Sequence, residues 1–132
     1  MLFSYLFFGL AHMAYLYLTT DELSSGLQRS VNENMRCAHD AGFIFMTPMV
    51  RQMKPDKKSA FRGLAYHWPT NAILLHPDAP DATVRHEIGH IIDFQSLFRT
   101  THPKIRENRH HGTEWFASVI GYYIKQHCKA AN

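Results

Sequence analysis

The chain has 132 residues, of which 45% are hydrophobic, and this suits a single domain with a real core. Its 14 Lys and Arg residues against 11 Asp and Glu residues give a formal net charge of +3, which is compatible with nucleic-acid binding but does not argue for it. With only Cys37 and Cys128, the composition excludes a disulfide-dense scaffold and any four-cysteine metal site. Because these cysteines are distant in sequence, we expect free thiols.

Residues 2–18 are almost all apolar, interrupted by Ser4, Gly9 and His12. The run is slightly short for a membrane span, which needs about 20 residues, and it lacks the features of a signal peptide. Since its polar positions show no helical period, we expect a helix that is buried or packed on a partner, with a membrane anchor as the alternative. Residues 1–18 are therefore separated from a domain over residues 19–132, and we expect a cytoplasmic protein, or a membrane-attached one if the segment is an anchor.

The first part of the domain is predicted to be a helix followed by a short strand. Thr19 can cap the helix, and an apolar residue recurs every four positions from Leu23 to Met35. The helix should end at Ala41-Gly42, and residues 43–46 have the composition of a strand.

The second part is predicted to alternate between basic or polar loops and regular elements. A basic loop over residues 51–62 leads into a strand, turn and strand over residues 64–75. A helix with an apolar stripe should run from about residue 80 to residue 98. A polar loop over residues 100–111 then precedes a last helix, which begins at residue 112 or 113 and ends near residue 127.

The helix over residues 80–98 carries His86, Glu87 and His90 in the order H-E-x-x-H. Spacing of four places the two histidines on one helix face, where they can hold a zinc ion. Glu87 projects beside them and can take a proton from a metal-activated water as it attacks a carbonyl group. The pattern therefore predicts a zinc-dependent hydrolase.

A catalytic zinc site needs a third protein ligand and an open fourth position. The metzincin spacing requires Gly and His where this chain has Asp93 and Ser96, which excludes that class. The candidates for the third ligand lie further along the chain: His102, His110, His111 and Glu114.

His111 is followed by Gly112 and, three residues further on, by Trp115. Together with the H-E-x-x-H helix and the preceding hairpin, this pattern resembles the SprT-like metallopeptidases, the family of Spartan-type proteases, over about residues 20–124. The resemblance implies that His111 is the third zinc ligand and that Glu87 is the general base. It also implies a protein or peptide substrate, with DNA-associated proteins as one class.

We expect an α+β fold, the zincin-like minimal metalloprotease core. In it a small antiparallel sheet packs with an N-terminal helix, the H-E-x-x-H helix and a C-terminal helix. The segment that begins at Glu114 also looks like the E-x-F-A segment of lethal-factor-like and other glutamate-liganded zincins, in which Glu114 would be the ligand. An alternative from another class is a catalytically weak, zinc-containing module that binds DNA or protein.

Two basic segments flank an acidic middle region of the chain. Solvated loops are the ordinary explanation of such segments. If the SprT-like resemblance extends to substrate recruitment, these residues contact DNA phosphates, and binding weakens steeply as the salt concentration rises. The residues concerned are Lys54, Lys57, Lys58, Arg62, Lys104, Arg106 and Arg109.

Overall fold

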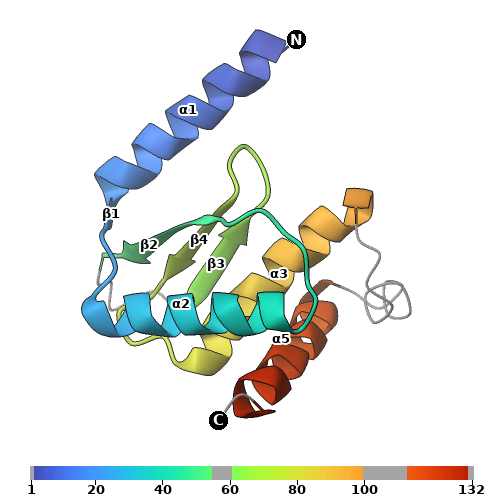
Figure 1. Cartoon of the computed structure of the whole chain (residues 1–132). Helices are drawn as coiled ribbons and strands as arrows, with labels where there is room; N and C mark the ends of the chain where they lie inside the picture. The colour runs from blue at the N-terminus through green and yellow to red at the C-terminus, as the bar shows by residue number, and fades with distance from the viewer. Residues whose placement is uncertain (1, 55–60, 100–112, 131–132) are drawn as a thin grey trace.

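The computed structural model describes residues 2–54, 61–99 and 113–130, which form an α+β fold (Figure 1). Four helices and a four-stranded sheet occur in these ranges. In chain order the elements are α1 (Leu2–Thr19), β1 (Thr20–Asp21), α2 (Ser25–Asp40), β2 (Met49–Met53), β3 (Gly63–Tyr66), β4 (Ala72–Leu75), α3 (Asp81–Arg99) and α5 (Thr113–Ala130).

The sheet has the strand order β1-β2-β4-β3 and is mixed, so the prediction of an antiparallel sheet is wrong for one pair of strands. β4 runs parallel to β2, with Met49 opposite Ala72, whereas the β1–β2 and β3–β4 pairs are antiparallel. The reason is that the chain leaves β2, forms the outer strand β3 first and then returns as β4 between the two. β3 is therefore left at the edge of the sheet.

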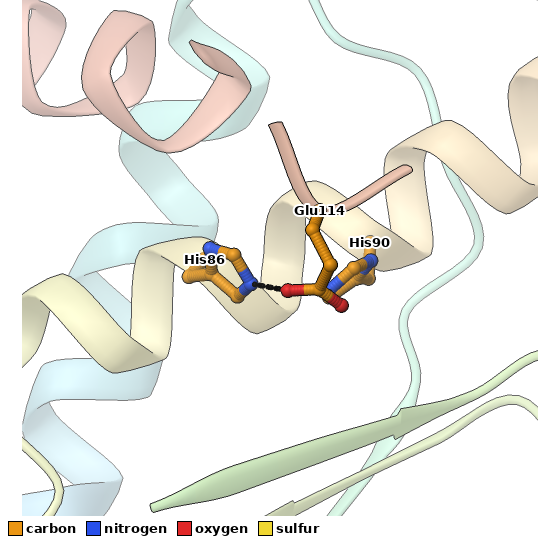
Figure 2. Close-up of side chains that lie close together, drawn as sticks. All are labelled: His86, His90 and Glu114. Atoms are coloured by element: carbon orange, nitrogen blue, oxygen red, sulfur yellow. Dashed lines mark hydrogen bonds and ion pairs between the residues drawn. The ribbon is translucent and has the colours of Figure 1, made fainter. Parts of the chain in front are cut away.

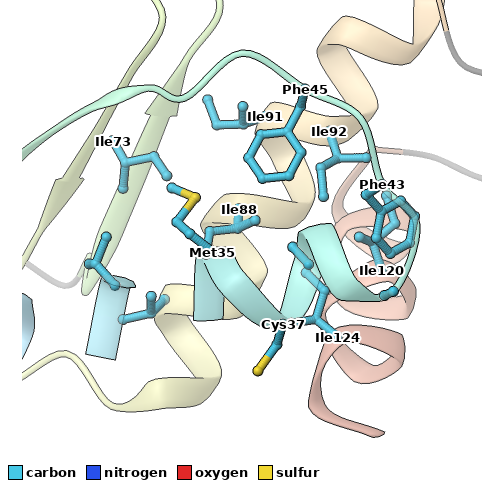
Figure 3. Close-up of a cluster of buried hydrophobic side chains, with 14 of the residues drawn as sticks. Met35, Cys37, Phe43, Phe45, Ile73, Ile88, Ile91, Ile92, Ile120 and Ile124 are labelled. Carbon is cyan, nitrogen blue, oxygen red and sulfur yellow. The ribbon is translucent and has the colours of Figure 1, made fainter. Parts of the chain in front are cut away.

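The main hydrophobic core lies between the sheet and helices α2, α3 and α5 (Figure 3). All four residues of β4 are buried, so side chains from the rest of the chain cover both faces of the sheet at this strand. Ile73 and Leu75 face this main core, while Ala72 and Leu74 pack on the opposite side with Leu16, at the end of α1. This alternation is the two-residue period of a strand that is covered on both faces.

Helices α3 and α5 run antiparallel and touch backbone to backbone. A β-carbon added to Gly89 of α3 would lie 2.4 Å from the carbonyl oxygen of Ala117 on α5. One added to Gly121 would lie 3.3 Å from the backbone of Arg85. These two glycines therefore allow a close approach that places the start of α5 beside the middle of α3.

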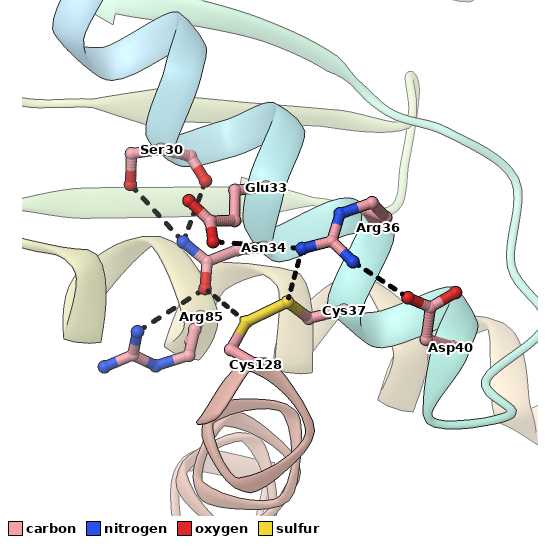
Figure 4. Close-up of polar contacts among 8 residues, drawn as sticks. All are labelled: Ser30, Glu33, Asn34, Arg36, Cys37, Asp40, Arg85 and Cys128. Atoms are coloured by element: carbon pink, nitrogen blue, oxygen red, sulfur yellow. Dashed lines mark hydrogen bonds and ion pairs between the residues drawn. A yellow bond between two sulfur atoms is a disulfide. The ribbon is translucent and has the colours of Figure 1, made fainter. Parts of the chain in front are cut away.

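The two cysteines form a disulfide, so the expectation of free thiols is wrong (Figure 4). Cys37 of α2 and Cys128 of α5 are 91 positions apart in sequence, but their α-carbons are 5.3 Å apart because the two helices pack side by side. The neighbouring Asn34 side chain accepts a hydrogen bond from Arg85 of α3 at 3.4 Å. Polar and covalent links thus join three helices at this end of the core.

Helix α1 extends away from the rest of the molecule (Figure 1). From Phe3 onward its large apolar side chains are exposed except for Leu16, as shown by Phe3 at 87% and Leu18 at 80%. His12 anchors it by a 2.6 Å hydrogen bond to Thr70. The expected helix is therefore present, but it is not buried within this chain. No described helix has both the length and the apolar character needed to cross a membrane.

Two local predictions differ from the structure because tertiary contacts use the backbone hydrogen-bonding groups of these segments. α2 begins at Ser25 instead of near Thr19, since residues 20–21 pair with β2, and the Ser24 side chain caps the helix by accepting from the backbone N–H of Leu27. Residues 43–46 form no strand. Phe43 and Phe45 are buried and the residues between and after them are exposed, as in a strand.

The backbone of Met46 shows why residues 43–46 remain outside the sheet. Its N–H donates to the Gln95 side chain at 2.7 Å, and its carbonyl accepts from the side chains of Gln95 and Asn71. These side-chain contacts replace the partner strand. β2 instead follows Pro48, and its last three residues lie in the segment predicted as a basic loop.

Candidate metal centre

His86 and His90 lie one turn apart on α3 and point toward Glu114, near the start of α5 (Figure 2). The Nε2 atom of His86 is 3.1 Å from one carboxylate oxygen of Glu114, and the Nε2 atom of His90 is 3.0 Å from the other. The two helices thus bring together three side chains from positions up to 28 residues apart.

These three donors fit a zinc ion. One ligand atom from each of His86, His90 and Glu114 lies within 4.8 Å of the others. Four ligands at zinc distances of about 2.0–2.2 Å in a tetrahedron are separated by roughly 3.3–3.6 Å, so small side-chain adjustments would bring these three donors to zinc distances. Two imidazoles and a carboxylate are a ligand set of catalytic zinc sites that leaves the fourth position open.

Neighbouring groups influence the orientation of His86 and the protonation state of His90. Ser118, one turn after Glu114 on α5, lies with its Oγ atom 3.1 Å from Nδ1 of His86, which leaves Nε2 directed at Glu114. His90 is buried, and burial together with the nearby His86 lowers its pKa, although the Glu114 carboxylate acts in the opposite direction. The neutral imidazole, which is the form that binds metals, is therefore favoured at His90.

Glu87 belongs to the same site without being one of the three clustered donors. Its side chain is buried and lines the cleft that contains His86, His90 and Glu114. Burial, followed by the charge of the Glu114 carboxylate, raises the pKa of Glu87 to about 7. A carboxyl group with a pKa near neutrality can both accept and release a proton at physiological pH.

The cleft in front of these residues has a volume of about 710 Å³. The edge strand β3 forms one wall, and α3 and the start of α5 form the other. Apolar side chains, including Phe61, Leu64 and Phe94, line it beside the ionisable groups. A cleft of roughly 300–1,000 Å³ in which polar groups converge beside apolar side chains is a usual form of a ligand-binding site.

The structure places some of the predicted site residues together, while another lies outside the described ranges. It brings His86, Glu87 and His90 together with Glu114, the alternative third ligand, whereas His111 lies outside the described residues. Sequence reasoning missed Ser118, although its spacing of four from Glu114 places both on one helix face.

Two of the seven basic residues predicted to contact nucleic acid lie in the described parts of the chain. Lys54 is exposed after β2. Arg62 lines the cleft, with Nη1 3.3 Å from Nε2 of His76. The remaining basic candidates lie outside the described residues: Lys57, Lys58, Lys104, Arg106 and Arg109.

Comparisons with known proteins add no relative from which a role could be transferred. No protein-family model matches the chain, and neither does any curated protein or solved structure.

Proposed function

We propose that the protein is a zinc-dependent metallopeptidase. The observation that carries the proposal is the convergence of His86, His90 and Glu114, with Glu87 lining the same cleft. When bound by the three donors, zinc would supply a Lewis acid that makes water nucleophilic near neutral pH. A site that only held a metal would have no need of a second, non-ligating carboxylate beside it.

Glu87 acts as the general base in this proposal. Its carboxylate accepts the proton of the attacking water at one oxygen and returns it to the nitrogen of the leaving amine. Burial raises the pKa of Glu87 to about 7 in the metal-free protein, and a bound zinc ion would lower it again, which favours the carboxylate form that a base requires.

The edge strand β3 supports an extended peptide as substrate. Within the sheet formed by the described residues it pairs with β4 on one side only, and its residues Gly63, Leu64 and Ala65 line the cleft. The free backbone groups of an edge strand can pair with an added peptide strand, and the apolar wall can hold its side chains. Cleavage of DNA-associated proteins is a narrower prediction that depends on the SprT-like resemblance alone.

Glu114 is the third donor in this proposal. Its contacts with both histidines support the glutamate-liganded arrangement. The SprT-like arrangement, with His111 as the ligand, stays a prediction. Zinc content measured by mass spectrometry on native protein separates the two: Glu114→Ala loses zinc if Glu114 is the ligand, and His111→Ala loses it in the other case.

Activity is tested with casein as an unstructured substrate, with and without DNA. Glu87→Gln should retain zinc and fold while losing activity by roughly 10²–10⁴-fold, because the amide cannot act as a base. A ligand variant such as His90→Ala should lose both zinc and activity. Wild-type protein that holds zinc but cleaves nothing would favour the binding module instead.

A further inference from the structure

We propose that Gly63 is a positioning residue for Glu87: the missing side chain leaves the space that the Glu87 side chain occupies against strand β3. The inference rests on the proposed function insofar as it assigns a catalytic consequence to this placement. The contact itself can be tested in the metal-free protein.

The distances define how tightly Glu87 lies on the strand. A β-carbon added to Gly63 would be 2.7 Å from Cγ of Glu87, 2.8 Å from its Oε1 and 3.0 Å from its Cδ. β-Carbons essentially never come that close to other heavy atoms. The conflict involves the middle of the side chain as well as its end, so any residue other than glycine would displace the carboxylate.

Backbone conformation does not explain this glycine. Among the described glycines, the one with positive φ is Gly42, at 94°. Gly63 lies in regular antiparallel register opposite Leu75 on β4, where alanine would be tolerated as far as the backbone is concerned. Ala65, two residues along the same strand, also lines the cleft and does carry a β-carbon. The need for glycine is thus confined to the position that faces Glu87.

The helix that carries Glu87 has little freedom to move away. Ile88 is fully buried in the core, and Gly89 is pressed against the backbone of α5. The added carbon of Gly63→Ala would therefore be accommodated by rotation of the Glu87 side chain, which changes where its carboxylate sits relative to His86 and His90.

The first test is the position of Glu87 in metal-free protein. Side-chain ¹³C resonances of glutamate are measured by NMR, with Glu87 assigned by Glu87→Gln and with exposed Glu22 as an internal reference. Gly63→Ala should shift the Cγ resonance of Glu87 and leave that of Glu22 unchanged. The control is Gly26→Ala, because a β-carbon at Gly26 meets nothing within 4 Å. An unmoved Glu87 resonance would overturn the inference, whether or not the protein is a peptidase.

The second test separates positioning from a structural role. Zinc-loaded Gly63→Ala should lose at least about tenfold in kcat while zinc content stays within about twofold, because proton transfer depends on the placement of the base. KM is measured separately, since Gly63 also lines the proposed substrate cleft. In a Glu87→Gln background the same change should have no further effect on kcat. Unchanged kcat, loss of zinc, or an equal loss in both backgrounds would refute the positioning role. If wild-type protein cleaves nothing, the proposed function fails and the NMR result alone decides the placement.

Discussion

Opening the Cys37–Cys128 disulfide should lower the stability of the protein substantially, because the bond restricts the unfolded chain. The cysteines are 91 positions apart, and closing a loop of that length removes chain entropy equivalent to about 4.6 kcal/mol at 25 °C. For a domain of this size, with an unfolding entropy of roughly 0.28 kcal/mol/K, that value corresponds to a decrease in Tm of about 17 °C. We expect a decrease of 7–17 °C, roughly, since measured disulfide effects commonly fall to about 2 kcal/mol.

The assay compares thermal and urea unfolding of oxidised and reduced protein, with thiol titration to establish the state of the sulfurs. Cys37 is only 1% exposed, so Cys37→Ser would add the cost of a buried hydroxyl, and Cys37→Ala with Cys128→Ala is the better variant. Reduced protein should also have a larger m value, because its unfolded state is more extended. A Tm that changes by less than about 2 °C, with both thiols demonstrably released, would refute the loop-entropy reasoning.

Three further predictions concern the site. Ser118→Ala should weaken zinc binding by roughly 10–100-fold, because the hydrogen bond to Nδ1 of His86 orients the imidazole. The affinity is measured by competition with a chromophoric chelator. Ser118→Thr keeps the hydroxyl and should lose much less affinity. Gly89→Ala should reduce the free energy of unfolding, measured in urea, by roughly 1–3 kcal/mol, because its β-carbon would overlap the backbone of α5. Gly26→Ala, the control, should be neutral or slightly stabilising. Equal effects of the two changes would contradict the packing argument. In metal-free protein the contribution of Glu87 to stability should be present below pH 4.5 and be lost as the pH rises to about 7, because the folded state holds this proton more tightly than the unfolded state. The difference in unfolding free energy between wild type and Glu87→Gln, measured across pH, separates this decrease from the opposite effect of the lowered His90 pKa, and a difference that stays constant would contradict it.

The sequence was sufficient to predict the parts of the fold that depend on local patterns. The apolar period and the H-E-x-x-H spacing correctly located α3, and the hairpin of β3 and β4 was confirmed. Both depend on neighbours within a few residues. The parallel pairing of β2 with β4 was missed because it depends on the order in which distant segments enter the sheet, and no local pattern records that order.

For the site, likewise, the residues that lie close together in sequence were predictable, and the contact between two helices was not. His86, Glu87 and His90 share one helix, so their spacing alone brings them together. The approach of Glu114 depends on how α5 crosses α3, a tertiary property to which the sequence contributes only the small residues at the crossing. The disulfide was missed for the same reason, because sequence distance says nothing about α2 and α5 being neighbours.

The contact between α3 and α5 at Gly89 has a consequence for the choice of metal. With backbone against backbone, no flexible side chain lies at that crossing to absorb a change in the separation of the helices. The backbones that carry the two imidazoles and the carboxylate are then held at a nearly constant separation, so adjustment to an ion falls to the Glu114 side chain, which is 80% exposed. Zinc, with bonds of about 2.0–2.2 Å, and calcium, with bonds of about 2.3–2.6 Å, would differ in the torsions that Glu114 must adopt and not in the spacing of the helices. The fold would thus discriminate between ions through its two imidazole ligands, which suit zinc better than calcium, while the helix packing keeps the start of α5 beside them.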